Sequence, residues 1–463
     1  MADREPNLEP EPEATPPSSS HQHQEAAVTT GARYSELPEL YAVFNAPLWE
    51  CFKRIALDLE YTVAPIRLNP PEFAKQPITD GVFALYLVHD APLSEYFKRA
   101  AHELKLTIVA QTFGLSGELE VEVKDYTLYS GLLGTAFLLF KSYQVTGNAA
   151  DLVHCSQIVK ACDNASLRSR DVTFLSGRAG VCALGAVAAL HSGNERLMEY
   201  YMLQFQKIEV PNDYADDLKI GRAGFLWACL FLNKHIGQDT IPYQYTARFV
   251  DEIIKNGRAL GRKGVCPLMF ESLGEKYWGA SHGLAGIMHV LMDMKLKPDE
   301  LEDVKGTLKY MIRNRLPSGN YPISEVDRND VLLNWCHGAP GIVITLVKAA
   351  KVFGDKEFLD AAMQAAKVVW EQGLHKRVGI CHGISGNAYV FLSLYQHTGD
   401  VEYLAMARCF TCSLLDRAHK EIPRGEMHGG DQPYSLFDGI GGLAYLLLDM
   451  VDPTQSKFPA YEL

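Results

Sequence analysis

The chain has 463 residues, of which 47% are hydrophobic and 22% charged, and its formal net charge is −12. This apolar fraction provides a large core and excludes a wholly disordered or fibrous protein. An acidic balance without a long Lys/Arg run argues against a nucleic-acid partner. Ten thinly spread cysteines differ from the dense disulfide framework of a small secreted protein, which favours reduced thiols and a cytoplasmic protein.

The N-terminal segment, residues 1–33, is rich in Pro, Glu, Ser and His. Such a composition predicts a disordered tail without the apolar core of a signal peptide. Residues 34–463 are expected to form one domain, and amphipathic stretches at 48–61 and 92–106 indicate helices near its start. A membrane span needs about 18–20 predominantly apolar residues. The longer apolar runs are too short or too polar, so no transmembrane segment is expected, while peripheral membrane association stays open.

A repeated motif begins after residue 125. A pair of glycines separated by two residues and followed by an apolar run recurs seven times, at Gly131/Gly134, Gly177/Gly180, Gly221/Gly224, Gly283/Gly286, Gly338/Gly341, Gly383/Gly386 and Gly439/Gly442. A spacing of roughly 45 residues with insertions indicates a repeat array. Five repeats carry a later glycine, mostly followed by Asn or Asp, as expected for a helix C-terminus and the next N-cap: Gly147, Gly193, Gly237, Gly354 and Gly399.

Each repeat is therefore predicted to be a helical hairpin. Its first helix, as in 134–140 or 341–347, is apolar on most sides and must be buried, whereas the second has one polar face. Seven such hairpins with the apolar helices inside predict an all-α fold, a double-layered α/α toroid. An open solenoid is the alternative, although it would expose both ends of the array. In the toroid the glycine pairs lie at one end of the ring. Close packing or a tight turn is the simplest explanation of the glycines themselves.

Potential metal ligands stand beside three of these glycine pairs. The three sequences are Ser281-His282-Gly283, Cys336-His337-Gly338 and Cys381-His382-Gly383. Because the repeats occupy equivalent places on one ring, these residues can converge at its centre. Two thiolates and one imidazole suit zinc, and three protein ligands leave a fourth position for water or a substrate sulfur. The Cys409/Cys412 pair is instead predicted to be part of the core.

The chain after the tail resembles the LanC-like proteins, eukaryotic relatives of bacterial lanthionine cyclases, and is similar to their plant-type members. The segments that carry the resemblance are LLNWCHGAPGIV, GICHGISGNAYVFLSLY, ASHGLAGI, SGNYP, PYSLFDGIGGLAYLL and KFPAYEL. The resemblance implies an α/α toroid with zinc held by Cys336, Cys381 and His382. His337 shares the local pattern but is not implied as a ligand, so it either orients the site or packs.

The resemblance also implies an activity. In the family a thiol adds to a dehydroalanine or dehydrobutyrine side chain of a protein or peptide, and in the eukaryotic relatives that thiol is glutathione. The resemblance nominates His282 as general acid or base, since imidazole exchanges a proton near neutral pH. A structural role for His282 is the alternative. Lys376, Arg377 and Arg424 are candidates to bind the carboxylates of glutathione, and Arg424 is matched only loosely.

Two further features bear on the substrate. Arg178 and Arg222 follow the first glycine of two repeats, where they would meet an anion near a helix N-terminus, although a solvated surface explains them at least as well. Relatives often carry a basic residue shortly before the first zinc Cys, whereas this chain has apolar residues at 331–333 and Arg328 farther back. Substrate selection is therefore expected to differ.

Competing functional hypotheses remain. The leading one is a zinc-dependent glutathione transferase acting on dehydroamino acids. The alternative is a non-catalytic adaptor or sensor that binds zinc and glutathione in a signalling or hormone-response pathway. A toroidal glycosidase is weaker because it needs two facing carboxylates, and a zinc prenyltransferase is weaker because its ligand set includes an Asp.

Overall fold

The computed structural model describes residues 90–113 and 123–463, and within these ranges the secondary structure is helical, with isolated β-bridges but no strand. The all-α prediction is confirmed. The tail expected at 1–33 and the amphipathic stretch at 48–61 lie outside the described residues, whereas the stretch at 92–106 forms part of helix α4 (Asp90–Phe113). None of the described helices is both long and apolar enough to cross a membrane.

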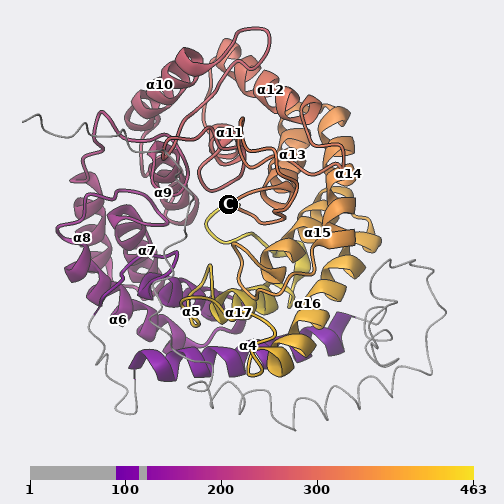
Figure 1. Ribbon diagram of the computed structural model, residues 1–463. Coiled ribbons are helices and arrows are strands. Elements are labelled where there is room, and N and C mark those ends of the chain that lie inside the picture. The colour runs from indigo at the N-terminus through magenta and orange to yellow at the C-terminus, as the bar shows by residue number, and fades with distance from the viewer. Residues whose placement is uncertain (1–89, 114–122) are drawn as a thin grey trace, which may run out of the picture.

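The helices form two concentric rings (Figure 1). The inner ring consists of α5 (Leu132–Thr146), α7 (Arg178–His191), α9 (Arg222–His235), α11 (Leu284–Leu291), α13 (Ala339–Phe353), α15 (Ile384–Thr398) and α17 (Ile440–Asp449). The outer ring consists of α6 (Ala149–Ser166), α8 (Glu195–Gln206), α10 (Tyr243–Leu260), α12 (Pro298–Arg313), α14 (Lys356–Gln372), α16 (Val401–Glu421) and α4. Each inner helix contacts the next, and α17 contacts both α15 and α5. The ring is closed, which excludes the open solenoid.

The seventh helix pair is assembled from the two ends of the described chain. Six inner helices are followed directly by their outer partner, but α17 is covered by α4, which precedes the first repeat. After α17 the chain forms only a short 3₁₀ turn, η3 (Pro453–Gln455). A hydrogen bond from Ser94 Oγ to the carbonyl of Val451, 2.9 Å long, joins the two ends. The N-terminal helix thus buries the apolar surface that the last inner helix would otherwise expose.

The turns between inner and outer helices follow the predicted capping pattern. Gly147, Gly354 and Gly399 end their helices in the left-handed conformation. The outer helices then begin at residues whose side chains accept a backbone N–H of the first turn: Asn148, Asn194, Asp355 and Asp400. Gly237 departs from the pattern because α9 ends at His235, Ile236 is its C-cap, and a longer turn leads to α10.

The paired glycines allow each inner helix to begin against the loop that precedes it. A Cβ atom at Gly386 would lie 1.8 Å from the carbonyl oxygen of Ile380, and one at Gly180 would lie 2.0 Å from that of Phe174. The second glycine of the other five pairs meets the carbonyl oxygen of the residue six positions earlier in the same way. Close packing is therefore the reason for the motif, as expected.

Backbone hydrogen bonds join the seven loops that precede the inner helices, which we call the rim loops, into a circle, with the second loop bonded to the first turn of α9 rather than to the loop before it. The residue two positions before each first glycine, which we call the rim position, lies within one residue of nearly every contact in this circle. The bonds run from Ala280 N to Trp335 O, Trp335 N to Cys381 O, Cys381 N to Phe437 O, Phe437 N to Tyr129 O, Tyr129 N to Leu175 O, Phe174 N to Gly224 O and Lys219 N to Ser281 O. The rim positions of distant repeats are thereby fixed relative to one another.

The C-terminal segment fills the middle of the ring, where Figure 1 places the C-terminus. Tyr461 is fully buried, stacks on His289 with ring centroids 4.0 Å apart, and accepts a 3.0 Å hydrogen bond from the Trp227 indole at its carbonyl. Phe458 stacks on Trp335, the residue before Cys336, at 5.1 Å. The C-terminal segment therefore packs against the fifth rim loop through the contact between Phe458 and Trp335.

Candidate metal centre

The rim circle brings the three predicted zinc ligands together. Cys336 and Cys381 occupy the rim positions of the fifth and sixth repeats, and His382 follows Cys381. One ligand atom from each of the three residues lies within 4.8 Å of the other two, and the Cys381 Sγ and His382 Nε2 atoms are 3.9 Å apart. Both thiols are buried, with 4% and 1% of the residue exposed. The sequence prediction placed the same three residues in one cluster.

The electrostatics of this cluster favour a thiolate at Cys381. Burial by itself raises the pKa of the Cys381 thiol, but the hydrogen bond from Cys336 and the charge of His382 outweigh burial and hold the pKa well below its usual value. The Cys381 sulfur in turn raises the pKa of His382, while burial and the Cys381 sulfur raise that of Cys336. These shifts favour a thiolate at Cys381 beside a positively charged His382, with the Cys336 thiol donating to the thiolate.

The donor set fits a zinc ion. Two sulfurs and one imidazole nitrogen are the ligand types of catalytic zinc sites that keep a fourth position open. In addition, Nδ1 of His382 is buried and has no hydrogen-bond partner among the described residues. A metal would relieve the repulsion between the two sulfurs. The role of these residues as ligands stays a prediction.

His337 stands beside the cluster but is outside it. The group of mutually close ligand atoms does not include His337. Burial lowers the pKa of His337 to about 4, so the imidazole is neutral near pH 7. Its ring lies 5.2 Å from the Tyr277 ring, which also faces His282 at 6.1 Å. His337 therefore shares its neighbour Tyr277 with His282 and is not part of the ligand group.

His282 is held by a carboxylate that sequence reasoning missed. The Nδ1 atom of His282 lies 3.1 Å from Oδ2 of Asp217, whose side chain is 1% exposed. The Asp217 carboxylate also accepts hydrogen bonds from the Ser272 hydroxyl, at 2.5 Å, and from the backbone N–H of Ile220, at 2.7 Å. Asp217 thus holds the imidazole ring through Nδ1, and the His282 side chain stays 14% exposed.

Two further rim residues were missed. Tyr129 and Lys219 occupy the rim positions of the first and third repeats, equivalent to Cys336 and Cys381. The Lys219 ammonium lies 3.7 Å from the centre of the Tyr129 ring, and the Tyr129 hydroxyl hydrogen-bonds the Cys381 sulfur. The positive charge of Lys219 also lowers the pKa of Cys336. The rim position itself is the signal that would have found both residues.

The basic residues nominated for glutathione lie at or near the rim. Lys376 and Arg377 are exposed on the segment that leads into Cys381, and this segment pairs with the loop around His428. The His428 N–H donates to the Lys376 carbonyl at 2.7 Å. The Cys381 sulfur raises the pKa of His382, and the charge of Arg377 opposes only part of that rise. Arg424 is exposed in the turn after α16, on the loop that carries His428, and its contact with a ligand stays a prediction.

The two arginines of the GRAG repeats are structural. The Arg178 guanidinium pairs with Asp163 at 2.9 Å and donates to the Ser166 hydroxyl. Arg222 is 3% exposed and pairs with Asp216 at 2.7 Å. Both cations already have carboxylate partners and are not presented to a ligand.

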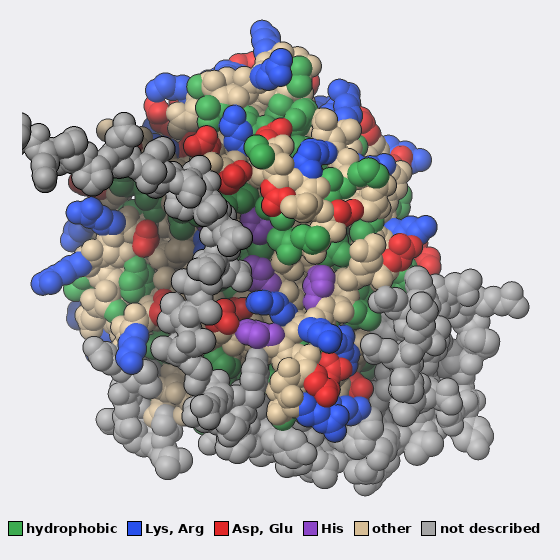
Figure 2. Space-filling view, in the orientation of Figure 1, with side chains coloured by type: hydrophobic (Ala, Val, Ile, Leu, Met, Phe, Trp, Pro, Cys, Tyr) green, Lys and Arg blue, Asp and Glu red, His purple; other side chains and the backbone are tan. Residues whose placement is uncertain are grey.

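Arg328 does not replace the missing basic residue before Cys336. Its guanidinium donates to the carbonyl of Asn314 and lies 5.9 Å from the Trp278 ring. Lys219 instead brings a cation to the thiols from another repeat. Figure 2 shows His side chains in a hollow at the centre of this face, with Lys and Arg side chains beside them.

Comparisons with known proteins identify the family of the chain. Residues 122–463 match the family model of lanthionine synthetase C-like proteins. The chain is 45% identical to LanC-like protein GCL1 of Arabidopsis thaliana over 74% of this chain and 82% of that protein. It is 36% identical to glutathione S-transferase LANCL1 of Danio rerio over 75% of this chain and 87% of that protein. The relatives include a glutathione transferase.

Solved structures support the fold. Nisin cyclase superposes with a TM-score of 0.55 and 17% sequence identity, covering 77% of this chain and 94% of the cyclase. This likeness concerns the toroid. The family match over residues 122–463 and the 45% identity to the Arabidopsis protein show that the chain belongs to the lanthionine synthetase C-like family, as a eukaryotic, plant-type member.

Proposed function

We propose that this protein catalyses the zinc-dependent addition of glutathione to dehydroalanine or dehydrobutyrine residues in proteins or peptides. In this reaction the sulfur bonds to the β-carbon of the alkene, and a proton is added at the α-carbon, so that the S–H is consumed and a thioether forms. The observation that carries the proposal is the Cys336, Cys381 and His382 cluster on the same rim as the His282–Asp217 pair.

Cys336, Cys381 and His382 would hold the metal. A zinc ion bound there lowers the pKa of a coordinated thiol and so supplies a thiolate near neutral pH. The described cysteines are free and buried, which supports reduced thiols and a cytoplasmic protein.

The chain's own groups handle the proton and the charge. His282, oriented by Asp217, accepts the thiol proton and returns one to the α-carbon, because imidazole serves as both base and acid near pH 7. The negative charge that develops next to the α-carbon faces Lys219, an ammonium without a carboxylate partner among the described residues. Burial keeps His337 neutral near pH 7.

Glutathione would be held through its carboxylates. Lys376 and Arg377 are exposed on the segment that leads into Cys381, and Arg424 lies on the neighbouring loop. An ammonium or guanidinium suits a carboxylate, and guanidinium can bind it with two parallel hydrogen bonds.

The test uses the purified zinc-loaded protein with glutathione and a dehydroalanine peptide. We expect mass spectrometry to detect a peptide carrying one added glutathione, formed faster than in the absence of protein. Cys381→Ala serves as the inactive control and Cys409→Ala as the active one. If wild type holds zinc and binds glutathione but does not accelerate the addition above the uncatalysed rate, the hypothesis of a non-catalytic adaptor or sensor is favoured instead.

A further inference from the structure

Among the described residues, the three most exposed large apolar side chains belong to two segments that lead into neighbouring rim loops. Val326 is 83% exposed, Val331 71% and Leu273 70%. Leu273 precedes the fourth rim loop, which carries His282, and the two valines precede the fifth, which carries Cys336. Open apolar surface is therefore concentrated on the two approaches to the proposed site, as expected for a surface that contacts a partner.

Backbone hydrogen bonds hold these two segments side by side. The N–H of Glu325 donates to the carbonyl of Lys276 at 3.0 Å, and the N–H of Trp278 donates to the carbonyl of Ile323 at 3.1 Å. The exposed apolar residues thus stand on one connected piece of backbone. On the face drawn in Figure 2, hydrophobic side chains lie beside the His side chains of the central hollow.

Leu273 stands where neither the turn nor the core explains a leucine. Ser272 and Glu275 pair by two backbone hydrogen bonds, of 2.9 and 3.0 Å, around a two-residue turn. The turn residues Leu273 and Gly274 have φ angles of 53° and 82°, in the left-handed region that favours Gly, Asn or Asp. The chain therefore presents an exposed leucine at a conformational cost, and such outliers point to a functional role.

The Leu273 turn is tied to the proposed general base. The hydroxyl of Ser272 donates to Oδ2 of Asp217 at 2.5 Å, and the same oxygen lies 3.1 Å from Nδ1 of His282. Ser272 is only 5% exposed. Leu273 therefore adjoins a residue that shares its hydrogen-bond acceptor with His282, which keeps the turn next to the proposed reaction site.

Val331 is also held in a fixed place. The side-chain amide of Asn320, which is 2% exposed, donates to the Asp330 carboxylate and to the Leu332 carbonyl, both at 3.0 Å. It accepts the backbone N–H of Ala339, the first residue of α13, at 2.8 Å. One buried amide thus fixes the residues on both sides of Val331. A pre-positioned surface binds a partner with little ordering cost.

The charge around these residues favours a peptide over a lipid surface. Segments 271–278 and 324–332 contain five acidic and two basic side chains. Anionic lipid headgroups are attracted by clusters of Lys and Arg, so an acidic surface repels them. A peptide with apolar side chains and few acidic ones meets no such repulsion.

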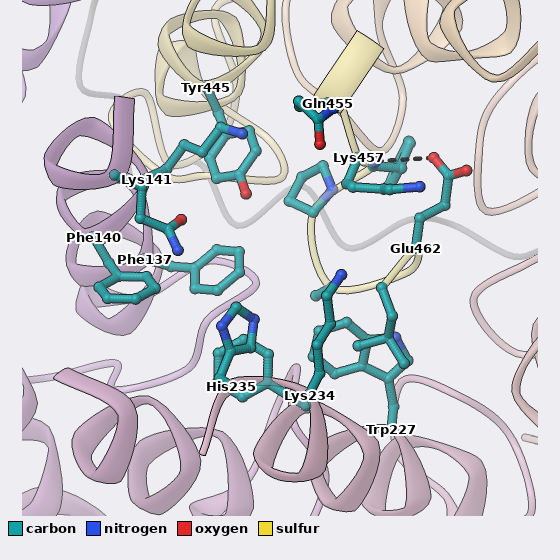
Figure 3. A pocket seen from close by; sticks show the side chains of 16 residues that line it. Phe137, Phe140, Lys141, Trp227, Lys234, His235, Tyr445, Gln455, Lys457 and Glu462 are labelled. Carbon is teal, nitrogen blue, oxygen red and sulfur yellow. Dashed lines mark hydrogen bonds between the residues drawn. The ribbon is translucent and has the colours of Figure 1, made fainter. Parts of the chain in front are cut away.

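The cavity at the end of the ring where the inner helices finish offers no comparable surface. Its volume is about 240 Å³, and it is lined by the later turns of α5, α9 and α17 and by the C-terminal segment (Figure 3). The Phe, Trp and Tyr residues in its lining are at most 6% exposed. Figure 3 shows the Glu462 carboxylate beside Lys457, so a negative charge is already present there.

We propose that Leu273, Val326 and Val331 select the peptide substrate by binding apolar side chains close to its dehydroalanine or dehydrobutyrine. This inference rests on the proposed function, because glutathione addition is what brings such a peptide to the rim. The substrate class is a peptide or protein segment with apolar residues on both sides of the dehydroamino acid and few acidic residues. Contact with the three side chains removes apolar surface of both partners from water.

Binding is tested with peptides that cannot react. Two fluorescein-labelled peptides carry leucine or serine on both sides of a central alanine, which stands in for the dehydroalanine, and are otherwise identical. Fluorescence anisotropy with the zinc-loaded protein is expected to show that the leucine peptide binds at least about tenfold more tightly, because its leucines bury apolar surface. Equal affinities, or no measurable binding of either peptide, would overturn the proposal.

Three variants and a matched control locate the surface. Leu273→Asn removes the apolar side chain and supplies a residue that accepts the left-handed conformation, so its thermal midpoint is expected not to fall. Leu273→Asn, Val326→Ser and Val331→Ser are each expected to weaken binding of the leucine peptide by about three- to tenfold. Val401→Ser, at a 66% exposed position at the start of α16, is the control and is expected to bind as wild type does. Unchanged affinity in all three variants, or an equal loss in Val401→Ser, would contradict the assignment.

Kinetics separate this inference from the proposed function. With the corresponding dehydroalanine peptides, the ratio of kcat/KM for the leucine peptide to that for the serine peptide is expected to fall about tenfold in Leu273→Asn and to keep its wild-type value in Val401→Ser. An unchanged ratio in Leu273→Asn would overturn the selection role. Absence of glutathione addition to either peptide would contradict the proposed function, whereas the anisotropy measurement would still decide whether the surface binds the peptide.

Other occupants of the surface are tested on the same preparations. Vesicles of phosphatidylcholine and phosphatidylserine are expected not to co-sediment with the protein, and wild type and Leu273→Asn are expected to have the same sedimentation coefficient. Vesicle binding or self-association that Leu273→Asn abolishes would assign the surface to a lipid or to a second copy of the chain, and would overturn the proposal.

Discussion

The Nδ1 atom of His282 lies 3.1 Å from the Oδ2 atom of Asp217, although the two residues belong to different repeats. Their loops are joined by the hydrogen bond from Lys219 N to Ser281 O, 3.1 Å long. The carboxylate is 1% exposed and the imidazole 14% exposed. The same circle of backbone hydrogen bonds that closes the toroid thus also positions Asp217 beside His282, the residue proposed as both general base and general acid.

The first prediction concerns this orientation. Asp217→Asn keeps the shape of the side chain but replaces a hydrogen-bond acceptor by an amide that also donates, so the ring of His282 loses its fixed tautomer. We expect kcat for glutathione addition to fall about 10²-fold or more, with KM for glutathione and zinc content unchanged. Steady-state kinetics and metal analysis check this. A normal kcat would mean that Asp217 only stabilises the fold.

The repeat could be predicted from the sequence because the contact that requires its glycines is made with a residue only six positions earlier in the chain. A Cβ atom at Gly386 or Gly180 would collide with the preceding loop, so every repeat must keep its glycines, and the toroid follows from their number and from the apolar helices behind them. Cys336 and Cys381 could be predicted because each stands two residues before the first glycine of a pair, with a His between the Cys and the Gly. The cover that α4 provides for α17 could not be predicted, because it joins segments outside the repeat period.

The missed residues show where the local pattern ends. Lys219 occupies the same rim position as Cys336. A comparison of this position in all seven loops, and not only in the loops that contain Cys or His, would have identified Lys219 as a candidate site residue. Asp217 does not occupy the rim position, so the repeat pattern does not identify it. Its contact with His282 depends on how the third loop packs on the fourth, and only the folded chain supplies that information.

The second prediction tests the cation at the rim. Lys219→Met removes the ammonium that lies over the Tyr129 ring and retains an unbranched side chain of similar length. We expect a loss of about tenfold to 10³-fold in kcat, because a charge facing the developing carbanion contributes most in the transition state. Lys367→Met, on the exposed face of α14, is the matched control. Initial rates decide the matter, and equal rates for Lys219→Met and wild type would remove Lys219 from the mechanism.

The third prediction concerns the packing role of the paired glycines. In Gly386→Ala the new methyl group would meet the Ile380 carbonyl oxygen at 1.8 Å, so the helix or the loop must move. We expect the free energy of unfolding to fall by about 3 kcal/mol. Gly237→Ala is the control, since its Cβ would have a nearest neighbour at 3.7 Å, the Thr240 hydroxyl. Urea unfolding measures both, and equal losses would contradict the packing explanation.

The fourth prediction concerns acid stability. Burial lowers the pKa of His235 from 6.5 to about 4 in the folded protein. Between these pH values the unfolded chain therefore binds more protons, and the free energy of unfolding falls as the pH falls, by up to about 3 kcal/mol from this residue. His235→Phe is expected to reduce this pH dependence between pH 6.5 and 4. Urea unfolding across that range tests it, and an identical slope for the variant and wild type would contradict it.

The most direct test of the central claim is to measure zinc content and the initial rate of glutathione addition on the same preparations of wild type, Cys381→Ala and His282→Ala. Wild type is expected to carry one zinc per chain and to add the thiol to a dehydroalanine peptide. Cys381→Ala should lose zinc and activity together, whereas His282→Ala should keep its zinc and react about 10²- to 10⁴-fold more slowly. Wild type without stoichiometric zinc, or His282→Ala at the full wild-type rate, would contradict the account.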